Sequence, residues 1–306
     1  MTIATCIGLR SHRRALLALV AAAGVCLATT AAADDINKRA AADPEGQVEV
    51  SNTSGSVKIQ AWERNEVEVT GDLGDDGEQL EFVASGKLTR VKVVLPGKKH
   101  SDGEADLTIR VPTRSSINVN TVSADIEVQG VMAAQRLQSV SADIRTQAGT
   151  EDVECKTVSG DIDIAGQGHR ALLTLTTVSG DARVRGVAGE VNANTVSGNV
   201  DLSLGDTTRS RLRSTSGDLN LQGKLVSDAK LDVESISGDV RINLQGPVAA
   251  EFDLSSFNGE IRNCFGAKAT RPDEYLPGTE LRFTQGAGTG RVRIKTMNGD
   301  ISVCHQ

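Results

Sequence analysis

Apolar and polar side chains alternate along most of the chain after residue 46, and the alternation breaks at a recurring phrase close to Thr-Val-Ser-Gly-Asp-Ile. The phrase occurs nine times between Thr121 and Ile301, and the first eight copies lie 18 to 21 residues apart. A fixed short period is typical of stacked units, here called rungs, that bury their apolar faces only against their neighbours. The third position of the phrase holds Ser123, Ser141, Ser159, Ser179, Ser197, Ser216, Ser237, Asn258 and Asn298.

Two positions of every rung are expected to form the core, because alternation with a period of two indicates strands that bury one face. The first position, two residues before the phrase opens, holds Val119, Leu137, Cys155, Leu175, Ala193, Leu212, Val233, Leu254 and Ile294. The second, directly after the acidic position, holds Ile126, Ile144, Ile162, Ala182, Val200, Leu219, Val240, Ile261 and Ile301. Equivalent side chains stack in this way when parallel strands pair in register.

The pattern therefore predicts an all-β, single-domain parallel β-solenoid with rungs of 18 to 21 residues and two short strands per rung. A three-sided rung is the alternative. Residues 47–120 carry the same alternation less regularly and are expected to form an amino-terminal β cap, since an open parallel edge invites pairing with other chains. The predicted organisation is a signal peptide at 1–33, a flexible segment at 34–46, the cap at 47–120, and repeats at 121–306 with an insertion near 265–290.

The first 33 residues have the pattern of an export signal. Arg10, Arg13 and Arg14 precede an apolar run from residue 15 to 28, and Ala31 and Ala33 form an A-x-A cleavage signal. An uncleaved anchor is the alternative, but the run is short of the roughly 20 residues that span a bilayer. The protein is therefore predicted to be exported, to the periplasm, the cell surface or the medium, without stable membrane insertion after cleavage.

Charge limits the classes of partner. Loss of residues 1–33 removes three Arg and no acid, which leaves 30 basic residues against 40 acidic ones. With aromatic residues at only 2% and no basic stripe apparent in the sequence, nucleic-acid binding is not expected. Attachment to anionic lipid is disfavoured for the same reason.

An acidic column follows the glycine of the phrase, and like charges stacked on one another need a compensating interaction. One interpretation is that each carboxylate accepts a hydrogen bond from its own turn. The alternative is a ladder of calcium ions between rungs; no other cofactor is expected. The calcium ligands would be Asp125, Asp143, Asp161, Asp181, Asp218, Asp239 and Asp300, and Asn199 and Glu260 occupy the two remaining places in the column.

Three cysteines follow the signal. Cys155 lies in the first core column and is expected to be a buried thiol. Cys264 and Cys304 each lie three residues after the second core position of their own rung, so adjacent rungs would place them at disulfide distance. The 40 residues between them correspond to one rung with an insertion or to two rungs. We expect the insertion, and therefore the disulfide.

Catalytic patterns are scarce. His100, His169 and His305 stand alone, without a serine, metal-binding or C-x-x-C motif to accompany them. Trp62, the only tryptophan, is expected to plug the core or cap, with sugar stacking as the alternative. An Asp pair acting on polysaccharide is the enzymatic hypothesis. No catalytic residue is predicted.

The repeated T-V-S-G-D-I phrase, Val67–Gly71 after Trp62, Ile261–Cys264 and Val292–Ile301 resemble a bacterial β-strand-repeat family of unknown function known as "putative adhesin". The resemblance covers roughly residues 45–304. It implies an exported β-solenoid with an adhesive or envelope role, and it carries no catalytic residues over to this chain.

The sequence thus predicts an exported, non-enzymatic β-solenoid that binds a glycan or protein of the bacterial cell envelope. The Thr and Ser columns beside the acids are expected to form the contact face, with many weak bonds acting together. The first alternative is a structural or envelope-stress signalling module that self-associates through its open end. A polysaccharide-active β-helix enzyme is the more distant alternative.

Overall fold

The computed structural model describes residues 34–74, 78–95, 104–271 and 277–306. The predicted signal peptide at 1–33 lies outside the described residues. Within the described ranges the chain forms strands, turns and bends and no helix, which confirms the all-β prediction. Accordingly, no helix of these residues is long and apolar enough to cross a membrane.

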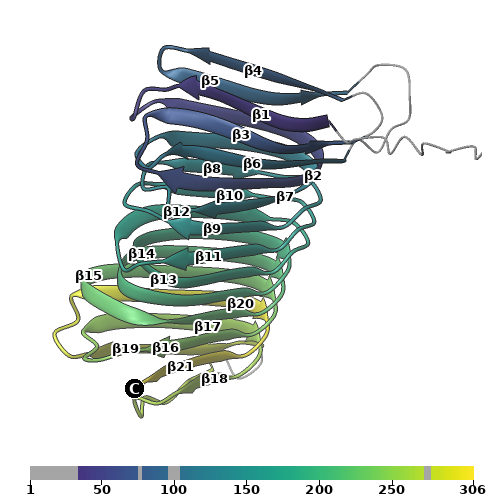
Figure 1. Ribbon diagram of the computed structural model, residues 1–306. Coiled ribbons are helices and arrows are strands. Elements are labelled where there is room, and N and C mark those ends of the chain that lie inside the picture. Colours follow the sequence, from purple (N-terminus) through teal and green to yellow (C-terminus); the bar gives the residue numbers. More distant parts are fainter. Residues whose placement is uncertain (1–33, 75–77, 96–103, 272–276) are drawn as a thin grey trace, which may run out of the picture. The chain divides into compact units, whose positions relative to one another are not determined.

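Each central rung consists of two strand segments joined at the phrase turn (Figure 1). The early rungs are β7 (Ser116–Gln129), β8 and β9 (Gln135–Gln138, Ile144–Ala148), and β10 and β11 (Val153–Lys156, Ile162–Gly166). Three longer strands then run from one rung into the next: β13 (Ala182–Ser197), β14 (Val200–Ser216) and β15 (Leu219–Ser237). They are preceded by β12 (Arg170–Thr177) and followed by β16 (Val240–Leu244), each of which is a single segment of its rung. All pair in parallel with the corresponding segments of the neighbouring rungs.

The register places equivalent residues on top of one another, as the period predicts. Cys155 pairs with Leu137 on one side and Leu175 on the other, and Ile162 pairs with Ile144 and Ala182. All eighteen residues of the two expected core columns are at most 8% exposed. The core therefore lies between the two strand segments of every rung.

The amino-terminal end combines parallel and antiparallel strands. β2 (Gln47–Trp62) pairs in parallel with β7 on one side and with β5 (Leu88–Val94) and β6 (Glu104–Pro112) on the other. The antiparallel cap consists of β4 (Gln79–Ser85) on β5, β3 (Glu66–Leu73) on β6, and β1 (Asp34–Ala41) on β3. Most of the segment expected to be flexible, 34–46, is thus strand β1.

The carboxyl-terminal end departs from chain order. β17 and β18 (Ala250–Asn258, Ile261–Asn263) precede β20 and β21 (Gly290–Asn298, Ile301–His305) in sequence. In space β20 lies between β15 and β17, and β21 lies between β16 and β18. The expected insertion contains β19 (Thr279–Gln285), which pairs antiparallel with β17. The stack is therefore not a simple solenoid in which each rung contacts only the next along the chain.

Candidate functional site

The phrase turns are stacked along one edge of the rungs, here called the turn edge, and their conformation follows from the residue that opens the phrase. The Thr157 hydroxyl accepts a hydrogen bond from the Gly160 N–H at 3.1 Å, and Thr177 accepts one from Gly180 at 3.0 Å. Such local side-chain to backbone bonds favour a turn over a continuing strand. The opening hydroxyl is consequently drawn inward, and the next two side chains face solvent.

The opening Thr and Ser residues are therefore not a contact surface. They are at most 7% exposed, so this half of the expected contact face is wrong: Thr121, Ser139, Thr157, Thr177, Thr195, Ser214, Ser235, Ser256 and Thr296. The third position of the phrase, which the sequence analysis also assigned to that face, is exposed in all nine turns.

Beside these exposed Ser and Asn residues runs an apolar stripe at the second position of the phrase. Its members are 38% to 54% exposed, although large apolar side chains are usually buried. They are, in stacking order, Val122, Val140, Val158, Val178, Val196, Ile236, Met297 and Phe257, with Thr215 interrupting between Val196 and Ile236. This stripe was not predicted from the sequence, even though apolar residues recur there next to positions that must turn inward.

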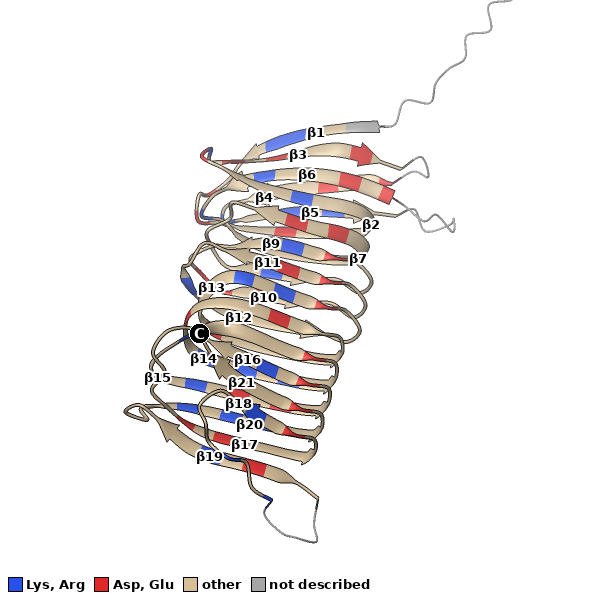
Figure 2. Cartoon of the chain, turned by 90° about the horizontal axis from the view of Figure 1, so that it is seen from below, with Lys and Arg blue, Asp and Glu red and all other residues tan. Residues whose placement is uncertain are grey.

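The acidic column lies on the other side of the turn, and Figure 2 shows acidic residues recurring at this edge on successive rungs. One carboxylate oxygen of Asp161 accepts the backbone N–H of Asp181 at 2.9 Å, and Asp143 does the same for Asp161 at 3.0 Å. The expectation that each acid bonds within its own turn is wrong, because the donor is the equivalent residue one rung further along the stack. The same bond, at 2.9 to 3.1 Å, joins Asp125, Asp143, Asp161, Asp181, Asn199, Asp218, Asp239, Asp300 and Glu260 in that order.

Arginines two residues after the acids neutralise part of this column. Arg145 pairs with Asp143 at 2.8 Å, and Arg241 bridges Asp218 at 2.8 Å and Asp239 at 2.7 Å. These contacts offset the repulsion between stacked carboxylates. Among the described residues, no group of three or more His, Cys, Asp or Glu side chains is arranged to hold a metal ion.

Asp161→Ala is expected to lower the free energy of unfolding by about 1 to 2 kcal/mol, because the Asp181 N–H loses its acceptor. Asp161→Asn is the matched control. Asn199 already fills this role in the column, where its amide oxygen accepts the Asp218 N–H at 3.0 Å. Urea unfolding of the two variants checks this, and equal destabilisation by Ala and Asn would show that charge, not the acceptor oxygen, matters.

The Arg241 guanidinium, by its hydrogen bond, holds the pKa of Asp218 below its usual range, against the opposing effect of burial. A carboxylate with a lowered folded-state pKa stabilises the fold above its unfolded pKa of about 4, and this contribution is lost as pH falls through the folded value. Arg241→Gln should therefore destabilise the protein at pH 6 and have a smaller effect at pH 2. Urea unfolding at both values measures this, and an equal effect at the two would contradict it.

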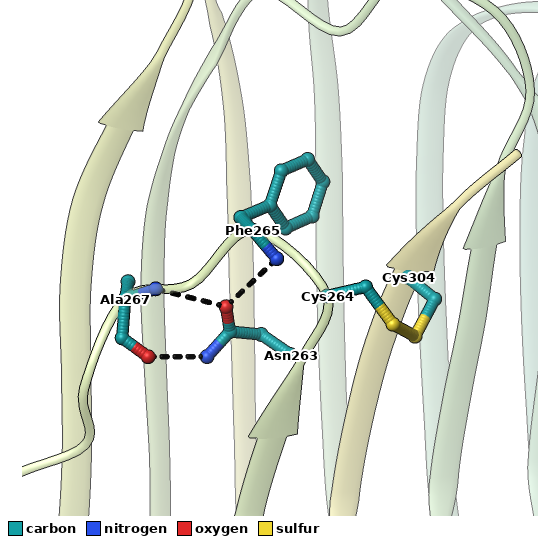
Figure 3. The surroundings of a disulfide bond; sticks show 5 residues. All are labelled: Asn263, Cys264, Phe265, Ala267 and Cys304. Atoms are coloured by element: carbon teal, nitrogen blue, oxygen red, sulfur yellow. Dashed lines mark hydrogen bonds between the residues drawn. A yellow bond between two sulfur atoms is a disulfide. The ribbon is translucent and has the colours of Figure 1, made fainter.

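The predicted disulfide is present. Cys264 and Cys304 are bonded, with their α-carbons 4.8 Å apart, because β18 and β21 are adjacent in the stack (Figure 3). The loop beyond Cys264 is held by the Asn263 side chain, which accepts the N–H groups of Phe265 and Ala267 and donates to the Ala267 carbonyl. The end of the β18 rung is thus fixed both covalently and by hydrogen bonds.

The remaining candidate residues, the free cysteine, the tryptophan and the described histidines, do not lie together in one site. Cys155 is a buried free thiol, and burial raises its pKa. Trp62 donates its indole N–H to the Glu66 carbonyl at 2.8 Å, and the guanidinium of Arg64 lies 5.2 Å from its ring centre. His169 is exposed, and His305 stacks on a phenylalanine of the β18 loop, with 4.7 Å between ring centres. His100 lies outside the described residues.

A comparison with curated protein sequences gives no match. Two solved structures are similar over most of their lengths at low identity. The "putative cell adhesion protein" of Clostridium sporogenes has 8% identity, covers 89% of this chain and all of its own, and superposes with a TM-score of 0.26. The "putative adhesin" of Bacteroides fragilis has 11% identity, coverages of 88% and 96%, and a TM-score of 0.42.

The family comparison covers most of the repeat stack. The model described as Toastrack DUF4097, a domain of unknown function, matches residues 75–304. This span includes all nine phrases and both cysteines of the disulfide. It confirms the resemblance drawn from the phrase itself, and the chain belongs to the Toastrack DUF4097 family.

Proposed function

We propose that the protein is an exported, non-enzymatic β-solenoid that binds an extended component of the bacterial cell envelope, in the manner of an adhesin, along its turn edge. The observation that carries this proposal is the apolar stripe. Eight large apolar side chains, each 38% to 54% exposed, line one edge beside a column of exposed Ser and Asn residues. Contiguous exposed apolar surface with a polar rim is typical of interaction sites.

The spacing of the stripe favours an elongated partner, a glycan or a protein segment. Adjacent parallel strands are roughly 4.8 Å apart, so the turn edge repeats the same apolar and hydroxyl groups at that interval. A partner with its own repeat along the edge makes many individually weak contacts together, which raises the overall affinity without any deep pocket. Antiparallel strands cap the amino-terminal end of the stack and cover β17 at the other end, whereas β18 pairs with β21 alone among the described strands, so self-association through that edge is the alternative that the assay must separate.

Export is part of the proposal. The disulfide between Cys264 and Cys304 supports an oxidising compartment, because disulfides persist outside the reducing cytoplasm. The A-x-A sequence before Asp34 supports cleavage there. The mature protein would then act in the periplasm, on the cell surface or in the medium.

The test uses the mature protein, immobilised and exposed to isolated envelope fractions and a glycan panel. We expect saturable retention of one fraction, and a dissociation constant on the order of tenfold higher for the double variant Val158→Thr and Val178→Thr. Thr215 already occupies this position in one rung, so threonine is compatible with the turn. The control is Val83→Thr, because Val83 is an exposed valine of β4 that pairs with Arg90 of β5 and lies outside the column of the stripe.

Each alternative predicts a different outcome of the same assay. Equal loss in the double variant and in the Val83→Thr control, or no retention, would reject the turn edge as the site. Concentration-dependent filaments would favour the self-associating structural or signalling module, and release of products from polyuronate would favour the enzyme. The proposal needs no calcium: added calcium should shift the melting temperature no more than sodium at matched ionic strength, and a larger shift would favour the calcium ladder.

A further inference from the structure

A second surface, separate from the turn edge, lies on the outer face of β14, β15 and β20. Here five basic side chains and one acidic side chain line a hollow of about 440 Å³, which we call the basic groove. Its residues are Arg209 and Arg211 of β14, Lys230 and Asp232 of β15, and Arg291 and Arg293 of β20. The surplus of four positive charges contrasts with the formal net charge of −7 for the whole chain.

Strand register brings these cations together. Lys230 is the direct partner of Arg209 on one side and of Arg291 on the other, so three cations occupy consecutive positions of one column. Like charges directly opposite each other on neighbouring strands are destabilising. In the neighbouring column Asp232 lies between Arg211 and Arg293, and Asp253 is the other direct partner of Arg293, so compensation there is greater than in the column of Lys230.

These cations are weakly paired within the protein. Arg209 reaches Glu190 at 3.8 Å and Arg291 reaches Glu251 at 3.7 Å, both at the outer limits of the cluster and both long for an ion pair. Among the described residues, Arg211, Lys230 and Arg293 have no carboxylate within 4.0 Å. The arginines of the acidic column, in contrast, approach their carboxylates at 2.7 to 3.3 Å.

We propose that the basic groove binds an acidic polysaccharide through its carboxylate, sulfate or phosphate groups. Arginine presents planar donors that match such oxyanions in bidentate geometry, and four of the five cations are arginines. A bound anion would relieve the repulsion in the column of Arg209, Lys230 and Arg291. This site is independent of the turn edge, because it lies on different residues and recognises charge instead of apolar surface.

The ligand can extend beyond the groove. A second hollow, of about 550 Å³, shares Arg291 and Arg293 with the basic groove and continues over β17 and β19. It adds Arg282, which is paired with Asp253 at 3.0 Å, and Glu251. Positive charge thus decreases away from β15, which favours a chain whose most strongly charged groups lie over β14, β15 and β20.

A polysaccharide fits better than the other polyanions. The only aromatic residues lining the two hollows are Phe252 and Phe283. Phe252 is 2% exposed, and Phe283 is half-buried with its ring stacked on Phe252 at 4.5 Å between ring centres, so these linings lack a series of exposed rings on which successive nucleic-acid bases could stack. A membrane surface would require a projecting basic patch, whereas these cations line a concavity on a chain of negative net charge.

No basic stripe is apparent in the sequence, and the topology explains why. Arg209 and Lys230 lie in consecutive rungs, but Arg291 is adjacent to Lys230 only because β20 is inserted between β15 and β17. One signal was available, since Arg209, Lys230 and Arg291 all lie five residues before the opening residue of their phrase.

The test is equilibrium titration of the exported protein at low salt with polygalacturonate, dextran sulfate, neutral dextran, single-stranded DNA and anionic phospholipid vesicles. We expect at least one acidic polysaccharide to bind and neutral dextran not to bind. The variant Arg211→Gln with Arg293→Gln should raise the dissociation constant about tenfold or more. The control Arg183→Gln with Arg185→Gln removes the same charge from arginines that are paired with Asp181 and Asp163, and should change it less than twofold.

A second variant tests the basic groove independently of Arg211 and Arg293. Lys230→Gln should raise the melting temperature of the free protein by about 1 to 2 °C, because it removes the middle cation of the column, and should reduce the shift produced by the polysaccharide. Absence of polysaccharide binding, or equal losses in the two double variants, would overturn the proposal. Tighter binding of DNA or vesicles with the same dependence on Arg211 and Arg293 would overturn the assignment of the ligand.

Discussion

Replacing Cys264 and Cys304 together by serine is expected to lower the free energy of unfolding by about 3 to 4 kcal/mol. The bond closes a loop with a sequence separation of 40 residues, and cross-linking a loop of this length restricts the unfolded chain by about this amount. The effect on the native state adds to it, because β18 has only three residues and, among the described strands, pairs with β21 alone. Urea unfolding of wild type and variant under oxidising conditions measures the difference.

A matched control separates loss of the bond from loss of a cysteine. Cys155→Val replaces a buried free thiol by a side chain of similar volume and should cost less than about 1.5 kcal/mol. Wild type unfolded in the presence of a reductant should behave like the double serine variant. If the double variant is as stable as wild type, the β18 rung does not depend on its covalent bond.

Gly180→Ala is expected to destabilise the protein by about 2 to 3 kcal/mol, because a β-carbon at residue 180 would lie 1.9 Å from the carbonyl oxygen of Gly160 in the adjacent rung. The obstacle is backbone, which cannot rotate away as a flexible side chain would. Relief requires the two turns to separate, and this would also stretch the bond from the Asp181 N–H to Asp161. Chemical unfolding, with circular dichroism as the readout, checks the prediction.

The control for this variant is Gly205→Ala. An added β-carbon at residue 205 would meet its nearest neighbour at 3.6 Å, an ordinary contact, so the change should stay within about 0.5 kcal/mol. Alanine already stands at the corresponding position of the first two phrase turns, as Ala124 and Ala142, so the requirement for glycine begins at Gly160. Similar stabilities of Gly180→Ala and Gly205→Ala would show that the turns are not packed as closely as described.

The core was predictable because it depends only on periodicity. Leu175 stacks on Cys155 whichever way the ends of the stack are built, since equivalent residues pair wherever consecutive rungs are in register. The disulfide was predictable for the same reason, once the residues between Cys264 and Cys304 were interpreted as an insertion. The repeat in the sequence therefore predicts which residues stack on one another in neighbouring rungs.

The order of the rungs was not predictable in this way. Nothing in the phrase around Asn298 distinguishes a rung that lies outermost from one that lies between β15 and β17. The basic groove depends on that order, so it could not be derived from the period alone.

The hydrogen-bond donor to each acid was not predicted for a related reason. The carboxylate of Asp161 accepts its bond from the next rung, and a single turn considered in isolation contains no such neighbour.

The apolar stripe was, in contrast, available from the sequence. Val158 follows a residue whose side chain is 4% exposed and precedes the turn, so strand alternation alone would place Val158 outward. A single apolar residue at an outward position needs no explanation. Its recurrence in eight of nine turns, however, indicates an interaction surface. This recurrence is the basis of the proposed function.

Footprinting of the turn edge tests the central claim most directly. The mature protein, alone and saturated with the envelope fraction that it retains, would be labelled with hydroxyl radicals and mapped by mass spectrometry. Labelling of Val158, Val178 and Val196 is expected to fall on binding, while labelling of Val83 on β4 is expected to stay unchanged. Protection confined to other surfaces, with the stripe labelled equally in both states, would contradict it.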